Sequence, residues 1–224
     1  MQPYQARSMG WAVSNKHIAY YRILEAFDAP GCPICRLLEQ DARSSIKWTL
    51  YEHVNDSDIR QELVASRGYC KEHSDLLIEL GHPLGVAIIY RDIIDAATAD
   101  LQSGAVLRRN RRGSKSRSQC PICKSVKGYL DRCLGTLTDN YGDDEMRSRL
   151  LSCRDLCIPH VELLLDRLPP NAQQELRQAA LSHLGELKAE LSEIIRKSDY
   201  RCEEPWGEEG NAWTRAVKRL SGHG

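Results

Sequence analysis

The chain has 224 residues, enough for one large domain or two small ones with a substantial hydrophobic core. Apolar residues make up 42% and charged residues 28%, a globular mixture that argues against a fibrous or membrane-spanning protein. Lys and Arg balance Asp and Glu at 31 each, so no net charge would draw the whole molecule to nucleic acid or to an anionic membrane.

The N-terminal tail, residues 1–15, has no apolar core of the length that a signal peptide needs. No segment approaches the roughly 20 apolar residues of a transmembrane helix, so we expect a cytoplasmic protein with no membrane partner. Thiol buffers keep cysteines reduced in that compartment. The nine cysteines therefore indicate metal ligands, catalytic thiols or buried apolar residues rather than disulfides.

The chain is predicted to be all-α, because apolar residues recur at three- and four-residue steps and alternating β-branched runs between hairpin turns are absent. Helices are expected near 16–28, 33–53, 57–66, 70–80, 84–107, 121–140, 143–151, 157–167 and 171–198. The predicted domains after the tail are a helical metal-binding module 1 (16–107), a basic linker (108–119), a helical metal-binding module 2 (120–198) and a C-terminal strap with a short helix (199–224).

The two modules are predicted to be tandem and homologous. The run Cys32-Pro33-Ile34-Cys35 recurs as Cys120-Pro121-Ile122-Cys123, 88 residues later. The pair Cys70 and His73 recurs as Cys157 and His160, 87 residues later. Because both motifs keep their separation to within one residue, the pattern indicates an internal duplication of whole modules.

Each module supplies three thiols and one imidazole, the donor set of a tetrahedral zinc site. We therefore predict two Zn²⁺ per chain, each tying one module together through a Cys₃His site. Four protein ligands fill the coordination sphere, which is typical of a structural ion. Iron or an iron–sulfur cluster stays open as an alternative, because spacing alone does not distinguish it from zinc. The first set is Cys32, Cys35, Cys70 and His73, and the second is Cys120, Cys123, Cys157 and His160.

The segment from Ala29 to Glu39, the Gly68-Tyr69-Cys70 run before His73, and the ending around Asp199-Tyr200-Arg201 and Pro205-Trp206-Gly207 resemble a prokaryotic family catalogued as a domain of unknown function. The resemblance covers residues 17 to 222. It implies a bacterial or archaeal cytosolic protein with two metal-binding modules, and it brings no reaction, substrate or partner.

Three cysteines lie outside the two motif sets. Cys133 and Cys202 are interpreted as buried apolar residues. Cys153 is four residues before Cys157, so a spare ligand or an oxidation sensor is the alternative interpretation there.

The linker carries six basic side chains and no acidic one, so it could bind the phosphates of a nucleic acid. A solvated linker is the favoured interpretation, since no aromatic residues are interleaved for base stacking. The strap contains Trp206 and Trp213, interpreted as packing anchors, with a partner-binding patch as the alternative. The candidate nucleic-acid contacts are Arg108, Arg109, Arg111, Arg112, Lys115 and Arg117.

No Walker A loop, dinucleotide fingerprint, nucleophile elbow or zinc-protease pair is present, so no catalytic residue is predicted. The resulting hypothesis is a non-enzymatic zinc-binding adaptor or regulator with a protein partner. A thiol-based redox or metal-responsive sensor is the alternative, and an iron or iron–sulfur electron-transfer protein is a weaker one.

Overall fold

A computed structural model describes residues 18–104 and 119–222. Within these ranges the protein is all-α, as predicted, and no strand is present. The elements are α1 (Ile18–Phe27), α2 (Pro33–Tyr51), α3 (Ser57–Ser66), α4 (Lys71–Leu80), α5 (Pro83–Gln102), α7 (Pro121–Asp139), α8 (Asp144–Ser152), α9 (Ile158–Leu165), α10 (Pro170–Lys197), the 3₁₀ turn η1 (Glu208–Asn211) and α11 (Ala212–Ser221).

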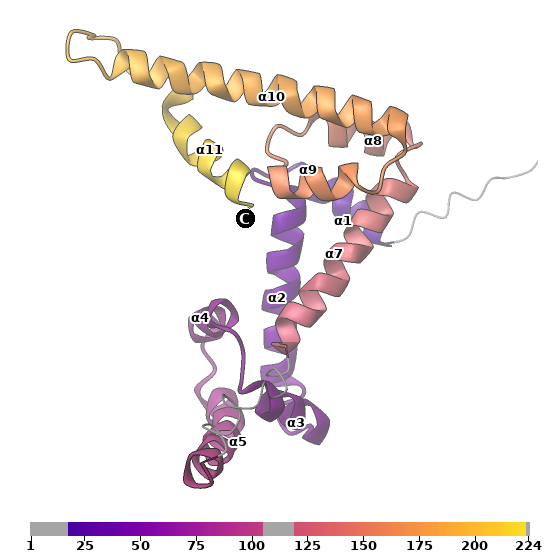
Figure 1. Cartoon of the computed structure of the whole chain (residues 1–224), viewed down its shortest axis with the longest axis vertical. Coiled ribbons are helices and arrows are strands. Elements are labelled where there is room, and N and C mark those ends of the chain that lie inside the picture. Colours follow the sequence, from indigo (N-terminus) through magenta and orange to yellow (C-terminus); the bar gives the residue numbers. More distant parts are fainter. Residues whose placement is uncertain (1–17, 105–118, 223–224) are drawn as a thin grey trace, which may run out of the picture.

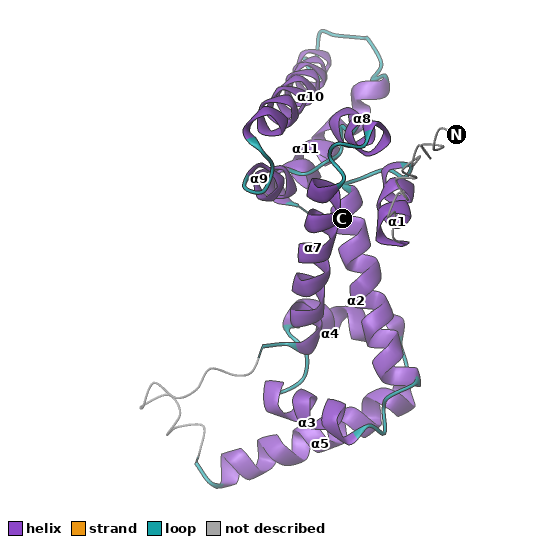
Figure 2. Cartoon of the chain, turned by 90° about the vertical axis from the view of Figure 1, so that its right-hand side faces the viewer, coloured by secondary structure: helices purple, strands orange, loops and turns teal. Residues whose placement is uncertain are grey.

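Two helices of 19 residues, α2 and α7, lie side by side and join two groups of further helices (Figures 1 and 2). The helices α3, α4 and α5 gather at one end of this pair, and α1 and α8 to α11 gather at the other. The N-terminus of α2 and the C-terminus of α7 lie at the same end of the pair, so the two helices are antiparallel. This direction decides where every later element is placed.

The helix starts follow from local sequence. Pro33 and Pro121 occupy the first turns of α2 and α7, where a missing N–H costs nothing, and both helices have 19 residues. The side chain of Asp56 caps α3 by accepting hydrogen bonds from the backbone N–H groups of Asp58 and Ile59. Asp143 caps α8 by accepting from the backbone N–H of Met146. The shared length and start of α2 and α7 accord with the predicted repeat, although common ancestry of the two halves stays a prediction.

The structure has two hydrophobic cores, and each draws on both halves of the sequence. The upper core combines α1 and the start of α2 with the end of α7 and with α8, α9 and α10. The lower core combines the rest of α2 and helices α3 to α5 with the start of α7. The ranges 16–107 and 120–198 therefore describe the sequence pattern and do not correspond to separate cores. Fully buried members include Tyr20, Ile34, Leu134, Leu137 and Leu164 above, and Ile46, Leu50 and Leu63 below.

Polar contacts hold α1 and the following loop against the second half of the chain. The Tyr20 hydroxyl donates to Asp143 Oδ1 at 2.6 Å, and the backbone N–H of Gly31 donates to Asp155 Oδ2 at 3.0 Å. These bonds span more than 120 residues of sequence. They fix the start of α2 beside the loop that leads into α9.

The C-terminal strap packs on α10 through residues other than its tryptophans. Lys197 pairs with Glu209 at 2.7 Å, and both side chains are largely shielded from solvent. Arg219 is 5% exposed and lies against the carbonyl of Ala180. The indoles of Trp206 and Trp213 are 54% and 57% exposed, so their interpretation as packing anchors is wrong. For Trp213 the physical reason is that α11 turns Ala212 and Arg219 toward the body, which leaves Trp213 and the other large apolar side chains of this helix exposed.

None of the helices in the described ranges combines the length and the apolar character that a membrane span requires.

We expect Leu134→Ala to lower the free energy of unfolding by about 3 kcal/mol, because it removes a fully buried side chain from the upper core and leaves a cavity. Denaturant unfolding followed by circular dichroism measures this change. Leu181→Ala is the control, since Leu181 is 62% exposed on α10 and its loss should cost well under 1 kcal/mol. Equal losses in the two variants would contradict the assignment of this core.

Candidate metal centres

Eight side chains form two clusters that could each hold a metal ion. In each cluster the four donor atoms lie within 4.8 Å of one another. Each cluster combines the Cys-x-x-Cys motif of one half of the chain with the Cys-x-x-His motif of the other. Site A consists of Cys32, Cys35, Cys157 and His160, and site B of Cys70, His73, Cys120 and Cys123.

The predicted pairing of the motifs within one module is therefore wrong, although the eight residues are the same. The antiparallel direction of α2 and α7 gives the reason. Each Cys-x-x-Cys motif opens a long helix, and the Cys-x-x-His motif of the same half follows only beyond the far end of that helix. A helix of 19 residues is about 28 Å long, too far for one ion to bridge. At each end of the pair the available partner belongs to the other half (Figure 2).

Every ligand sits at a helix N-terminus. Cys32, Cys70, Cys120 and Cys157 are the N-caps of α2, α4, α7 and α9, and none of their side chains caps its own helix. The second ligand of each motif follows three residues later, on the same first turn. Two helix N-termini thus point at each site, and their partial positive charge stabilises thiolates. This offsets the single net negative charge that three thiolates leave on a divalent ion.

The spacing at site A fits one tetrahedral ion. At zinc bond lengths of about 2.3 Å to sulfur and 2.0–2.1 Å to nitrogen, two sulfurs lie about 3.8 Å apart and sulfur and nitrogen about 3.6 Å apart. The Sγ atoms of Cys35 and Cys157 are 3.7 Å apart. His160 Nδ1 lies 3.5 Å from Cys32 Sγ and 3.4 Å from Cys35 Sγ. It lies 3.0 Å from Cys157 Sγ.

Site B has similar spacing and is more open to solvent. The Sγ atoms of Cys70 and Cys123 are 3.6 Å apart. His73 Nδ1 lies 3.1 Å from Cys70 Sγ, 3.4 Å from Cys123 Sγ and 3.8 Å from Cys120 Sγ. All four ligands of site A are buried, whereas Cys70 and Cys123 are partly exposed. Sulfur atoms at these separations are not disulfide-bonded, and all nine cysteines are free.

Burial and close neighbours shift the pKa values of the candidate ligands. Burial, together with the neighbouring thiol of Cys70, raises the pKa of Cys123 to about 12. Burial works to lower the pKa of His160, but hydrogen bonds to the thiolates of Cys157 and Cys32 outweigh it and raise this pKa to about 9. Burial lowers the pKa of His73, which favours the neutral ring that a metal ligand needs. A cation at either site therefore competes with protons.

The end of the C-terminal strap covers site A. The thiol of Cys35 lies 3.2 Å from the carbonyl oxygen of Gly222. A Cβ atom on Gly222 would lie 3.2 Å from Pro159 Cγ and 3.7 Å from Cys157 Sγ, and the backbone there has a φ of +73°. Only glycine suits this close, left-handed approach. Sequence reasoning missed Gly222, because nothing in its local sequence distinguishes it from the other glycines of the tail.

The remaining candidate residues lie outside both sites. Cys153 belongs to neither cluster, and burial raises its pKa to about 11, so it is a protonated thiol at neutral pH and a poor nucleophile. Cys133 is buried in the upper core, as predicted. Cys202 is partly exposed and lies 3.9 Å from Nη1 of Arg196, so its interpretation as a buried residue is wrong. The six basic side chains proposed to contact nucleic acid, Arg108, Arg109, Arg111, Arg112, Lys115 and Arg117, lie outside the described residues.

Comparisons with known proteins extend over nearly the whole chain. The profile of a family described as a family of unknown function (DUF6062) matches residues 15–224. A relative from Caldicellulosiruptor sp. (strain Rt8B.4), described as an uncharacterized 23.9 kDa protein in the xynA 3′ region, is 24% identical over 206 residues. The alignment covers 89% of this chain and 99% of that protein. No solved structure matches the chain.

Paired substitutions test the crossed arrangement. In the presence of a chelator that the parent protein withstands, we expect Cys35→Ser with Cys157→Ser to keep one ion per chain, because both residues belong to site A. Cys35→Ser with Cys70→Ser should lose both ions, because it removes one ligand from each site. Elemental analysis after gel filtration gives the ion count. If each ligand set lay within one module, the result would be reversed: Cys35→Ser with Cys70→Ser would keep one ion, and Cys35→Ser with Cys157→Ser would lose both.

Proposed function

This chain belongs to that family of unknown function, and we propose from the geometry of sites A and B that it is a non-enzymatic zinc protein with a binding or regulatory role. In this proposal two structural ions fasten the two halves of the chain to each other. The observation that carries it is the crossed pairing, because each ion then joins segments that are more than 120 residues apart at site A and about 50 apart at site B.

The donor set supports zinc as the resident ion. Three thiolates and one imidazole are the ligands that zinc prefers, and four protein donors leave no open position for a substrate or a catalytic water. When bound, the ion supplies a cross-link rather than a reaction. Its contribution to folding is on the order of 10 kcal/mol, similar to the whole stability of a small domain.

The separation of the donors also supports a single ion over an iron–sulfur cluster. A cluster of several irons distributes its ligands over different metal atoms, so its ligand sulfurs lie farther apart than the donors around one ion. Here all four donors of each site lie within 4.8 Å of one another. A mononuclear iron would share this spacing, and the metal content of the purified protein distinguishes it from zinc.

The proposed compartment and partner follow from the same chemistry. Free thiols and thiolate-bound zinc persist where glutathione and thioredoxin keep cysteines reduced, which favours the cytoplasm. Because four protein donors fill each coordination sphere, the proposed protein partner would contact the surface outside the two sites. Nucleic-acid binding through the basic linker stays a weaker proposal, because its residues lie outside the described ranges.

Removal of the metal should destabilise the whole protein. We expect a strong zinc chelator to lower the melting temperature and the helical signal in circular dichroism, because both sites join the two halves. Protons compete for the thiolates, so the stability that zinc adds is present at neutral pH and lost as the pH falls; without any chelator, less zinc should stay with the protein through gel filtration at pH 5.5 than at pH 7.5. Zinc added back should restore the signal and magnesium, which prefers oxygen ligands, should not. A fold that withstands complete removal of metal would contradict a structural role.

One observation favours a second candidate, a thiol-based redox sensor. Cys70 and Cys123 of site B are partly exposed, whereas the ligands of site A are buried and the end of the strap lies over them. Oxidants reach exposed thiolates first. Under this candidate, oxidation at site B releases its ion and loosens the lower core while site A stays intact.

Mild peroxide distinguishes the sensor from a purely structural protein. If site B senses oxidants, one zinc per chain should leave early and return after reduction, as followed with a zinc-binding dye and with intact mass for the oxidised cysteines. The Cys153→Ser variant is the control, and it should release zinc at the parent's rate because Cys153 is not a ligand. Retention of both ions under these conditions would exclude the sensor and leave the structural role.

A further inference from the structure

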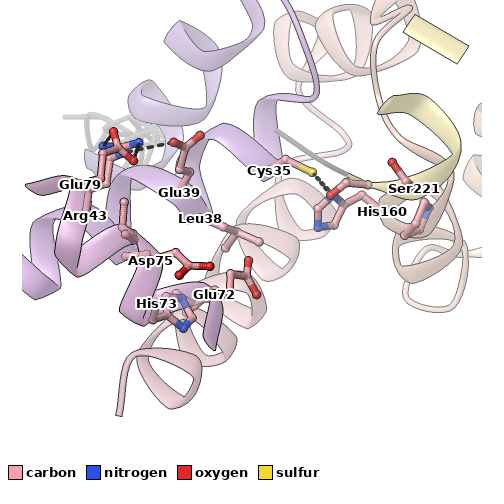
Figure 3. Close-up of a pocket in the computed structure, with 15 residues that line it drawn as sticks. Cys35, Leu38, Glu39, Arg43, Glu72, His73, Asp75, Glu79, His160 and Ser221 are labelled. Carbon is pink, nitrogen blue, oxygen red and sulfur yellow. Dashed lines mark hydrogen bonds and ion pairs between the residues drawn. The ribbon is translucent and has the colours of Figure 1, made fainter. Parts of the chain in front are cut away.

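A cavity of about 580 Å³ lies between the two candidate metal centres (Figure 3). Its walls are formed by one face of α2 and one face of α4, with contributions from α7, α9 and the end of α11. Cys35 and His160 of site A line one end, and His73 of site B lines another part of the wall. A volume of this size is typical of ligand-binding clefts.

The cavity has an apolar floor. Leucine, alanine, valine and proline side chains from four helices contribute to it, so a ligand that fills the cavity buries apolar surface there. These residues are Leu38, Ala42, Leu76, Val126 and Pro159.

The rim of the cavity is strongly acidic. Glu39, Glu72, Asp75 and Glu79 line it, together with Arg43. Arg43 donates to both oxygens of Glu79 at 3.0 and 3.1 Å and also to Glu39 at 2.9 Å, so its charge is already paired.

No Lys or Arg within residues 18–104 and 119–222 pairs with Glu72 or Asp75. Each Cys₃His site would add one further negative charge when it holds a divalent ion. The cavity therefore attracts cationic groups.

Two buried imidazoles add hydrogen-bond donors to this acidic cavity. His73 and His160 are 7% and 6% exposed and line the cavity, while their Nδ1 atoms face the sulfurs of sites B and A. Within the described part of the chain, the second ring nitrogen of each has no hydrogen-bond partner. A metal-bound histidine donates its other N–H to a carboxylate, a carbonyl or water. The site therefore offers two N–H groups to acceptors on a ligand, beside carboxylates that favour cations.

We propose that this cavity binds a short segment of a partner protein that carries Lys or Arg side chains, a proposal that rests on the binding role proposed above. Backbone carbonyls of the segment accept from the two imidazoles, its basic side chains pair with Glu72 and Asp75, and its apolar atoms cover the floor. The lining face of α2 runs from Cys35 to Arg43, about 12 Å at 1.5 Å per residue. An extended peptide covers that length with about four residues.

The helix that ends at this cavity carries a second apolar surface. Ser221 and Gly222, at the end of α11, line the cavity, and the residues before them include Trp213, Val217 and Leu220. These three recur at steps of four and three residues, so they share one helical face, and each is more than half exposed. An exposed apolar face of this kind on a helix that leads to a charged cavity is typical of a protein-binding surface.

Short synthetic peptides test the proposal on the full-length, zinc-loaded protein. The probes are four-residue peptides, capped at both ends and fluorescently labelled, in which two leucines alternate with two arginines or with two glutamates. Fluorescence anisotropy should show binding of the basic peptide at least tenfold tighter than binding of the acidic one. Glu72→Gln with Asp75→Asn should weaken the basic peptide roughly five- to tenfold, the effect expected for two charge pairs at a partly exposed site.

The matched control is Glu203→Gln with Glu208→Gln, which removes the same charge from exposed positions of the strap and should leave binding unchanged. Metal content is measured on every variant. Glu72→Lys with Asp75→Lys, at two ions per chain, should reverse the preference toward the acidic peptide.

Three results would overturn the inference. The first is equal affinity for the two peptides, and the second is an equal loss of affinity in the control variant. The third is displacement of the basic peptide by spermidine that binds as tightly as the peptide does, which would assign the cavity to small amines. If the zinc-loaded protein shows one of these results yet unfolds on chelation, the cavity proposal fails and the structural role of the ions stands. Loss of peptide binding together with a metal content of zero in the parent protein would instead remove the proposed function.

Discussion

The antiparallel packing of α2 on α7 is the constraint on which the rest of the structure depends. Each helix begins with a pair of cysteines and is followed, beyond its far end, by the Cys-x-x-His motif of the same half. Two such units packed antiparallel bring each cysteine pair beside the histidine motif of the other half, and neither unit completes a site alone. The same geometry mixes both halves in each core, so an ion bound at either site would join segments that also share a core.

This arrangement brings together residues that are far apart in the sequence. Closing site A joins residues more than 120 positions apart, and such contacts are entropically costly to form before the intervening helices are placed. A tightly bound ion offsets that cost more effectively than one apolar contact does. The polar contacts of Tyr20 and Gly31 with the loops around α8 act in the same direction, because they hold the start of α2 beside Cys157 and His160.

The two centres and the cavity between them share residues. His73 and His160 each turn Nδ1 to a site and belong to the cavity wall, so a ligand in the cavity would contact groups whose position depends on the ions. The strap takes part as well, since Gly222 lies against Cys35 and also lines the cavity. A ligand in the cavity would therefore lie against side chains that also belong to the two candidate metal centres.

The sequence by itself determined the helices and the eight ligands. Local signals suffice for both: apolar periodicity and capping residues specify a helix over a few turns, and the spacing within Cys-x-x-Cys or Cys-x-x-His places two donors on one ion. Only the tertiary structure decided how the four motifs pair, because that depends on the relative direction of α2 and α7, which no local pattern encodes. The tertiary structure likewise decided that Trp213 is exposed, that Gly222 covers site A and that a cavity forms between the sites. Each of these features depends on which helix faces meet.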